Sequence, residues 1–504
     1  MLIYKSFVTQ INLTGMDRNF KAKWVVWLHP ESDRKSLFGG DTSQGRQPWS
    51  VFTPTMSISI YRNFKSRWIV VATCLIFLFL MACKKQTATV AQVPIAPIVQ
   101  PPVAGGSIVN TTHLEKLTVP VIFLNGETAQ GIYVYADAPN YTPTPAGGEG
   151  FTCVDDVARG VLFYLRTASF STDTSIQNKT FGLLRFLINM QSDNGYFYNF
   201  LQSPNIINKS GITSVNQPKW WSWRALQALT ESLPVIQSVN AVLANKINLV
   251  VDKLIVVIKK DMVNTPQTTT QINGIAVPEW LPEGADQAAT LLLGLIPYCQ
   301  SANDAVIKVY IRKLADGISL TQLGDAHHFP YACFLTSGNS WHAYGSDMAT
   351  ALFKTGIFLN DTSYTAKAMA EVNSFYPWLI NNGFKNSFDV TLSGNAFTIE
   401  NEKVFEQIAY GIRPMVFAAI DAYLLTSDEK YADMAGHLAA WFLGKNTAVA
   451  NMFSINTGRC YDAINTGNAI NKNSGAESTI EALLTMQRVS NYPTVKAAMD
   501  RYKL

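Results

Sequence analysis

Two neighbouring stretches of the chain, Asn245-Lys-Ile-Asn-Leu-Val-Val-Asp-Lys253 and Ala288-Ala-Thr-Leu-Leu-Leu-Gly-Leu-Ile296, have different helical patterns. The first mixes apolar and charged residues at helical spacing, which is typical of a helix with one face in water. The second is apolar almost all round, which is typical of a helix buried on every side. Alternation of these two kinds of helix predicts an inner ring of helices inside an outer ring.

Helical spacing recurs along the chain, and apolar segments such as Met415-Val-Phe-Ala-Ala-Ile420 alternate with charged ones. The spacing predicts twelve helices, over residues 154–170, 176–191, 219–235, 239–262, 284–302, 303–318, 342–358, 363–382, 403–426, 428–444, 475–490 and 492–503. Six helical hairpins of this kind predict an all-α fold, an (α/α)6 toroid. A short strand-like stretch with a turn at Asn125-Gly126 precedes the helices, over Val119 to Tyr135.

Long joints lead from each charged helix to the next apolar one, and they are rich in aromatic and acidic residues. In a toroid these joints all open on one face, and elaborated loops are where functional residues concentrate. Aromatic rings with a polar edge also suit stacking on sugar faces. The candidate substrate contacts in or beside these joints are Arg159, Trp220, Trp221, Trp223, Arg224, Glu283, Asp286, Trp341, His342, Tyr344 and Glu406.

Several short motifs carry a resemblance to a known family. They are Cys-x-Asp-Asp-x-Ala-Arg at 153–159, Trp-Ser-Trp-Arg-Ala-Leu at 221–226, Trp441-Phe-Leu-Gly-Lys-Asn446, Gly458-Arg-Cys-Tyr-Asp462 and Asn473-Ser-Gly-Ala-Glu-Ser-Thr479. Over about residues 130–500 the chain resembles the six-hairpin glycosidase-like superfamily, in particular a bacterial lipoprotein branch. The resemblance implies a carbohydrate-active (α/α)6 domain. We expect the protein to use no cofactor and no metal.

Two polar signatures open the first and the eleventh predicted helices, Thr152-Cys-Val-Asp155-Asp156-Val-Ala-Arg159 and Ser474-Gly-Ala-Glu477. The resemblance implies a base near the start of the domain and an acid near its end. Glycoside hydrolysis needs such a pair of carboxyl groups. We therefore expect Glu477 to be the acid and Asp156, or Asp155, to be the base.

The same two signatures have a purely structural interpretation. Ser474 to Glu477 and Thr152 to Asp155 both have the spacing of a capping box, in which the acid reaches back to the N–H of the cap residue. Under this interpretation the acids only begin helices, and the protein is a non-catalytic glycan-binding lipoprotein. A further alternative is a polysaccharide lyase or epimerase that uses His342 and Tyr344.

The N-terminal part predicts export and anchoring to a membrane. Arg62, Lys65 and Arg67 precede an apolar run over 68–80 that ends in Leu80-Met-Ala-Cys83, which resembles the lipobox of bacterial lipoproteins, with Cys83 as the lipidated residue. An uncleaved membrane anchor is the alternative. The predicted segments are an extension over 1–55 before a start at Met56, a signal peptide over 56–83, a Pro-rich tether over 84–110 and the glycosidase-like domain over 111–504. We expect the protein on the periplasmic face of an outer membrane.

The charge balance argues against a nucleic-acid partner. Residues 1–83 hold ten Lys/Arg and four Asp/Glu, which leaves thirty against thirty-two, a net charge of −2, in the rest. The body therefore carries no basic stripe. Four cysteines lie in the body, Cys153, Cys299, Cys333 and Cys460. Cys153 and Cys460 each lie beside a polar motif, so a disulfide between them and buried free thiols both remain open.

Overall fold

The computed structural model describes residues 107–504. The predicted extension, the signal peptide with Cys83, and the tether up to residue 106 lie outside the described residues. The first residues that the structure describes already pack on the folded part, since Ile108 is buried and the Asn110 amide donates to the carbonyls of Ile455 and Asn456. Among residues 107–504, no helix combines the length and the apolar character needed to cross a membrane.

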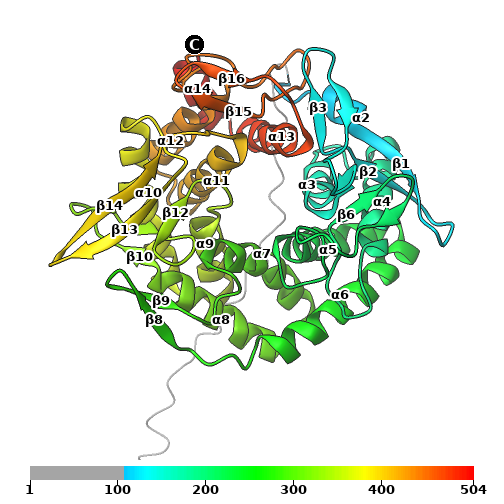
Figure 1. Cartoon of the computed structure of the whole chain (residues 1–504), viewed down its shortest axis with the longest axis horizontal. Helices are drawn as coiled ribbons and strands as arrows, with labels where there is room; N and C mark the ends of the chain where they lie inside the picture. The colour runs from blue at the N-terminus through cyan, green and yellow to red at the C-terminus, as the bar shows by residue number, and fades with distance from the viewer. Residues whose placement is uncertain (1–106) are drawn as a thin grey trace, which may run out of the picture. The chain divides into compact units, whose positions relative to one another are not determined.

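Six helices form a closed inner ring (Figure 1). Each helix packs against the next, and the last one packs against the first. The helices are α3 (Val154–Leu165), α5 (Trp220–Val239), α7 (Ala285–Ala302), α9 (Met348–Leu359), α11 (Ala409–Thr426) and α13 (Ala476–Ser490). The closure of α13 on α3 brings together residues more than three hundred positions apart, as the sequence predicts.

Six further helices lie outside this ring, each in a hairpin with the inner helix before it. They are α4 (Thr174–Asn189), α6 (Ala241–Asp261), α8 (Ala305–Leu320), α10 (Thr362–Asn381), α12 (Glu429–Ala439), which the 3-10 turn η1 (Ala440–Phe442) extends, and α14 (Pro493–Tyr502). α6 shows the expected amphipathic pattern, because Leu243, Ile247 and Leu254 are buried while Lys246, Asp252 and Lys253 are exposed. The (α/α)6 toroid and its twelve helices are confirmed.

The predicted strand-like stretch is also present, as an antiparallel hairpin of β1 (Thr118–Ile122) and β2 (Thr128–Ile132) that follows the short helix α2 (Thr112–Leu117) and packs on α4. The turn at Asn125-Gly126 joins the two strands, and Gly126 has a positive φ that suits glycine there.

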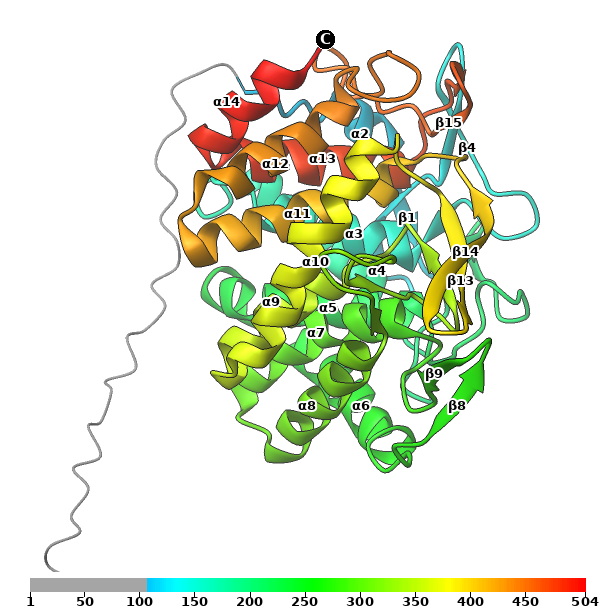
Figure 2. The same ribbon diagram turned by 90° about the vertical axis from the view of Figure 1, so that its left-hand side faces the viewer.

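Short antiparallel strands pair within the long loops, and the helical pattern of the sequence does not predict them. Figure 2 shows the labelled strands gathered at one side of the helices. The sheets are β3 (Tyr135–Asp137) with β4 (Thr142–Thr144); β5 (Thr152–Cys153), β6 (Phe200–Gln202) and β7 (Ile206–Ile207); β8 (Thr269–Ile272) with β9 (Ile275–Pro278); β10 (Gln322–Leu323) with β11 (Cys333–Phe334); β12 (Ser340–His342), β13 (Ser387–Ser393) and β14 (Ala396–Lys403); and β15 (Ala463–Thr466) with β16 (Ala469–Asn471).

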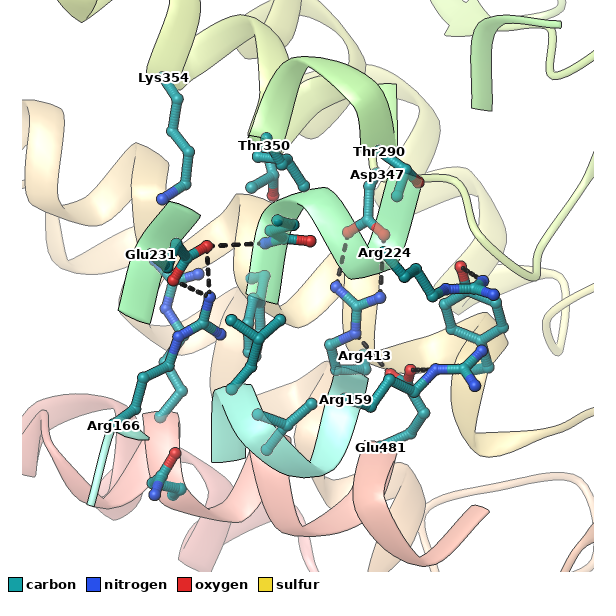
Figure 3. Close-up of a pocket in the computed structure, with 18 of the residues that line it drawn as sticks. Arg159, Arg166, Arg224, Glu231, Thr290, Asp347, Thr350, Lys354, Arg413 and Glu481 are labelled. Carbon is teal, nitrogen blue, oxygen red and sulfur yellow. Dashed lines mark hydrogen bonds and ion pairs between the residues drawn. The ribbon is translucent and has the colours of Figure 1, made fainter. Parts of the chain in front are cut away.

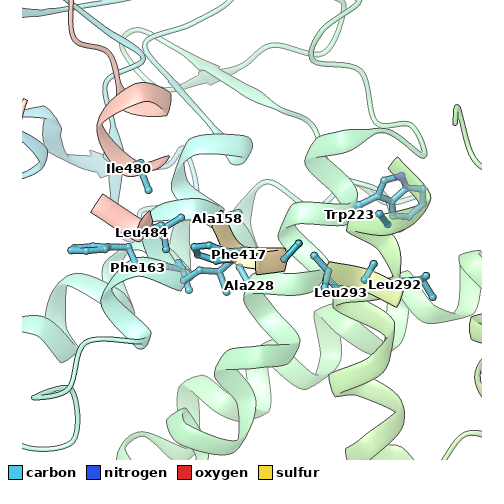
Figure 4. Close-up of a cluster of buried hydrophobic side chains, with 14 of the residues drawn as sticks. Ala158, Phe163, Trp223, Ala228, Leu292, Leu293, Phe417, Ile480 and Leu484 are labelled. Atoms are coloured by element: carbon cyan, nitrogen blue, oxygen red, sulfur yellow. The ribbon is translucent and has the colours of Figure 1, made fainter. Parts of the chain in front are cut away.

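The core lies between the inner helices and around them. Buried side chains from several inner helices meet there, among them Phe163 of α3, Phe417 of α11 and Leu484 of α13 (Figure 4). Small residues let neighbouring helices come close: a Cβ added to Gly294 of α7 would lie 2.9 Å from the backbone nitrogen of Gln227 in α5. The inner ring is therefore held rigidly enough to fix the side chains at its loop end.

Candidate active site

A pocket opens on the loop side where α3, α11 and α13 begin. Its volume is about 380 Å³, and it draws lining residues from strands β3, β6, β15 and β16 as well as from the three helices. This loop pocket contains five acids, namely Asp155, Asp156, Glu406, Asp462 and Glu477, together with Arg159 and Tyr410. The structure thus brings together the carboxylates of the two signatures, as predicted.

One buried arginine joins these carboxylates. Nη1 of Arg159 lies 2.8 Å from Asp156, Nη2 lies 2.8 Å from Glu477, and Nε lies 2.9 Å from Glu481. Only 6% of the Arg159 side chain is exposed. Because Arg159 belongs to α3 and the two glutamates belong to α13, this guanidinium connects the first and last helices of the inner ring.

The capping-box interpretation of Glu477 is wrong. Helix α13 has Gly475 as its N-cap without a side-chain cap, and the Gly475 N–H donates to Asp462 at 2.8 Å. The Ser474 hydroxyl instead shares a hydrogen bond with Thr479. Asp462 comes from the loop before β15, so a distant carboxylate has taken over the cap and Glu477 is left to face Arg159.

The capping-box interpretation of Asp155 is wrong as well. The N-cap of α3 is Cys153, which makes no side-chain cap, and the Thr152 hydroxyl accepts a hydrogen bond from the Ile132 N–H of β2. Asp155 forms an ion pair with Arg224 of α5 and accepts from the Asn199 amide. Strand pairing at Thr152 therefore removes the cap that the spacing suggests.

The inner and outer helices differ in how their N-termini are capped. Five outer helices begin with an Asp or Asn whose side chain accepts backbone N–H groups, namely Asp173, Asn240, Asp304, Asp361 and Asp428. None of the six inner helices has a side-chain cap. Acids in the first turns of the inner helices are therefore free for contacts across the ring, in the positive field of the helix N-termini.

Burial changes the acidity of the two central carboxyl groups. Glu477 is surrounded by the walls of the loop pocket, with 44% of its side chain open to it. Burial raises the pKa of Glu477, although the charge of Arg159 opposes this. Asp156 is only 3% exposed, and burial raises its pKa too, against Arg159 and a hydrogen bond from the Cys153 thiol. Both Asp156 oxygens are therefore occupied, while Glu477 can reach a ligand.

Asp155 lies in a second set of contacts. Arg224, its ion-pair partner, also donates to the Tyr410 hydroxyl at 2.6 Å and stacks against the Trp220 ring at 4.7 Å. Burial raises the pKa of Tyr410 to about 12 against the opposing charges of nearby arginines, so this phenol stays protonated. Of the Asp155 side chain, 18% is exposed.

A buried layer of charge that sequence reasoning missed lies beneath the loop pocket (Figure 3). Arg413 of α11 is bonded to both oxygens of Asp347, at 2.6 and 2.9 Å, and to Glu481 at 2.6 Å. Burial lowers the pKa of Arg413, but the two carboxylates outweigh it and hold the side chain charged. A signal was present in the sequence, because Arg413 is a charge among the apolar residues of the first half of α11, where only a buried partner makes a charge tolerable.

His342 forms a second candidate centre with Asp286. Its Nε2 lies 3.1 Å from the Asp286 carboxylate, and its Nδ1 lies 2.8 Å from the Tyr344 carbonyl oxygen. The His342 and Tyr344 rings stack with centroids 3.7 Å apart. Burial raises the pKa of Asp286, and the hydrogen bond from His342 opposes this. Tyr344 and Glu406 line one small cavity, which shares Glu406 with the loop pocket.

Most of the predicted tryptophan contacts belong to the core. Trp221, Trp223 and Trp341 are at most 6% exposed. Trp221 donates to the Phe197 carbonyl, and Trp341 stacks on Phe388. A ring enclosed in this way offers no face to a sugar, so we correct the expectation for these three and keep half-buried Trp220 and exposed Tyr344. The sequence places them beside the loops but does not tell which way each ring turns.

Glu283 and Glu406, the two glutamates among the predicted substrate contacts, lie in different surroundings. Glu283 pairs with Lys219 at 2.6 Å and is absent from the lining of the loop pocket. Glu406 is exposed and lines the pocket, and within residues 107–504 its carboxylate makes no ion pair or side-chain hydrogen bond. Glu406 is thus a free carboxylate at the pocket wall.

All four cysteines of the body are free and buried. Burial raises the pKa of the Cys153 and Cys460 thiols well above the usual value. The structure therefore favours the free-thiol alternative over a disulfide. Over the described part of the chain, no group of three or more His, Cys, Asp and Glu side chains could hold a metal ion.

No protein-family model matches the sequence, and neither does any curated protein. Solved structures are similar in fold. A sugar epimerase from a ruminal bacterium has 12% identity and a TM-score of 0.49, over 71% of this chain and 92% of that one. A cellobiose 2-epimerase from Bacillus thermoamylovorans has 12% identity and a TM-score of 0.48, over 75% and 96%.

Two glycoside hydrolases are also similar. The GH76 alpha-mannanase of Bacteroides thetaiotaomicron has 12% identity and a TM-score of 0.45, over 68% of this chain and 87% of that one. A GH127 beta-arabinofuranosidase has 12% identity and a TM-score of 0.42 over 67% of this chain, which spans only 52% of that enzyme. Both hydrolases and epimerases are thus among the similar structures, and the fold of this chain, fixed by its own closed ring of helices, is the (α/α)6 toroid.

Proposed function

We propose that the protein is a carbohydrate-active enzyme that hydrolyses a glycosidic bond of an oligosaccharide or polysaccharide in the loop pocket. The observation that carries the proposal is the contact of Glu477 with Arg159 rather than with its own helix end. Two acids with separate environments lie in one pocket, as glycoside hydrolysis requires.

The roles follow from exposure. Glu477 is the general acid, because burial raises its pKa and so favours its protonated form, and because its side chain reaches the pocket. It donates that proton to the glycosidic oxygen as the bond to the anomeric carbon breaks. Asp155, the more accessible aspartate, is the carboxylate that takes a proton from the attacking water. Asp156 holds Arg159 in place and is a positioning residue.

The test compares the full-length protein with its variants on a panel of glycans. Glu477→Gln and Asp155→Asn are expected to lower kcat by about 10²–10⁴-fold, the usual contribution of acid/base catalysis. Glu400→Gln, on the exposed strand β14, is the matched control and retains full activity. Unchanged turnover in both site variants overturns the assignment, and glycan binding without turnover by the wild type identifies a binding module instead.

A second candidate function is supported by the His342 and Asp286 contact. A lyase or epimerase abstracts a proton from a sugar carbon, and His342 is held beside the pocket by a buried carboxylate. Its Nε2 contacts Asp286 and its Nδ1 contacts the Tyr344 carbonyl, so it acts as the base only when a substrate displaces one of these contacts. This alternative predicts an unsaturated product or uptake of solvent deuterium at that carbon. Both products are lost in His342→Ala and are retained in Glu477→Gln.

We propose further that the chain is exported and anchored at the periplasmic face of an outer membrane through a lipid on Cys83. The basis is the sequence of residues 56–83 alone. Labelling of cells with a fatty-acid analogue tests it: the wild-type protein incorporates label and Cys83→Ala does not. Equal labelling of the two contradicts the assignment.

A further inference from the structure

The centre of the inner ring holds a second cavity, distinct from the loop pocket. Its volume is about 230 Å³, and Figure 3 shows its lining. The layer of Arg159, Glu481, Arg413 and Asp347 forms one part of its wall. We refer to it as the ring cavity.

The ring cavity extends toward the C-terminal ends of the inner helices. Arg166 is the residue at the end of α3, Arg488 lies in the last turn of α13, and Lys354 lies in the second half of α9. These three cations are absent from the lining of the loop pocket, whereas Arg159 and Tyr410 line both spaces. A ligand of the ring cavity therefore approaches from the side opposite to the loops.

Cations exceed acids in this lining. Six lining side chains are basic, namely Arg159, Arg166, Arg224, Lys354, Arg413 and Arg488. Three are acidic, Glu231, Asp347 and Glu481. Ion pairs within the lining neutralise part of this charge, since Arg166 binds Glu231 at 2.8 Å and Arg413 binds Asp347 and Glu481. Three lining arginines also bind acids outside the lining: Arg159 binds Asp156 and Glu477, Arg224 binds Asp155, and Arg488 binds Asp421.

Hydrogen-bond donors remain unused after these pairs. Arg166 and Arg488 each bond their carboxylate through Nη2 alone, although a guanidinium carries five N–H groups. Lys354 makes no ion pair or hydrogen bond through its ammonium among residues 107–504, yet its charge helps Arg166 to lower the pKa of Glu231 against the effect of burial. The Thr350 hydroxyl, 2% exposed, lines the cavity and lacks a hydrogen-bond partner there.

We propose that the ring cavity binds a small tetrahedral oxyanion, with inorganic phosphate as its test ligand, between Lys354, Arg166 and Arg488. Unused donors on three cations match an anion that offers several acceptor oxygens. The cavity volume equals the liquid volume of roughly eight water molecules at about 30 Å³ each, which accommodates a small oxyanion and a few waters.

The experiment is a calorimetric titration of the full-length protein with sodium phosphate, and with sodium chloride at matched ionic strength. Wild type is expected to bind phosphate and not chloride, and Lys354→Gln to raise Kd at least about tenfold, the loss of one charge-assisted bond. Lys430→Gln, on the exposed start of α12, is the control and leaves Kd unchanged.

Two results overturn the proposal: no binding of phosphate by the wild type beyond that of chloride, or the same Kd in Lys354→Gln as in the wild type. Lys354 is exposed at the mouth of the cavity, so this variant keeps its fold. The readout is binding, and it stands whether or not the protein hydrolyses glycans. A sugar phosphate, tested in parallel, shows whether the site accepts an ester, and weaker binding than inorganic phosphate is expected from the size of the cavity.

Discussion

Arg159 holds three carboxylates in or beside the core, and one of them, Glu481, also pairs with Arg413. Such a network fixes the positions of these side chains more than it stabilises the fold. The free energy lost when the charges leave water is about as large as the free energy gained when they pair. Removal of Arg159 has a larger effect on stability, since it leaves Asp156 and Glu477 without an ion-pair partner among residues 107–504. The function and the stability of the site therefore depend on the same side chain.

Arg159→Met is expected to lower the free energy of unfolding by about 3–5 kcal/mol, the usual result of breaking a buried pair. The loss is smaller at acid pH, because burial raises the pKa of Asp156 and this carboxyl needs no cation once it is protonated. Urea unfolding at pH 5 and pH 8 measures both effects. Arg312→Met is the control, since Arg312 pairs with Asp361 at the surface and its loss costs at most about 1 kcal/mol. Equal losses in the two variants contradict the buried network.

Glu371 of α10 provides a pH test outside the site. It is buried, it accepts from the Phe334 N–H at 2.9 Å, and burial raises its pKa to about 8 from 4.5. Between those values the folded state binds more protons than the unfolded state, so stability falls as pH rises from about 4.5 to 8, by at most about 1.4 kcal/mol per pH unit. Glu371→Gln is expected to flatten this slope. An unchanged slope in chemical unfolding at several pH values refutes the expectation.

At the element scale, the sequence predicts all twelve helices because buried and amphipathic periodicities are local properties. The errors lie in the helix bounds: α3 ends at Leu165 and not at 170, and the largest errors are at two helix starts. Helix α9 begins at Met348 and not at 342, since Ser340–His342 pair with β13. Helix α11 begins at Ala409 and not at 403, since Ala396–Lys403 form β14. Strand pairing between distant segments leaves no trace in a helical pattern.

Helices α5 and α7 approach each other closely at Gly294, so a larger side chain there is expected to destabilise the fold. Gly294→Ala puts a Cβ 2.8 Å from Leu226 Cγ and 2.9 Å from the Gln227 nitrogen, and such overpacking is expected to cost about 1–3 kcal/mol. Gly147→Ala is the control, because nothing lies within 4 Å of a Cβ there. Denaturant midpoints measured for both variants check the difference, and equal midpoints argue against close packing of the inner ring.

At the scale of the whole molecule, ring closure is what assembles the site. The sequence predicts that the Asp155-Asp156 pair meets Glu477, because six hairpins can close only in that way. It does not predict the contacts of Arg413 with Asp347 and Glu481, or of Arg224 with Asp155, because these depend on which side chains face the ring axis. Nor does it predict that Asp462 accepts the N–H of Gly475, the N-cap residue of α13. Such details arise only when distant loops are placed together.

Deletion of residues 475–504 removes α13 and α14, and with them the closure of the ring on α3. The apolar faces of α3 and α11 are then exposed to water. Arg159 also loses its two partners on α13, Glu477 and Glu481. We expect loss of cooperative thermal unfolding and strong binding of a hydrophobic dye. Deletion of residues 503–504 alone, beyond the end of α14, is the control and leaves a cooperative transition. A cooperative transition in the longer deletion shows that closure is dispensable.

The central claim is that Glu477, held by Arg159 in the loop pocket, donates a proton to the leaving group. The most direct measurement compares Glu477→Gln and wild type on the glycan that the panel identifies and on an aryl glycoside with an acidic leaving group, which departs without a proton. The account predicts a loss of about 10²–10⁴-fold on the glycan and little loss on the aryl glycoside. Equal losses on the two substrates, or full activity on the glycan, contradict it.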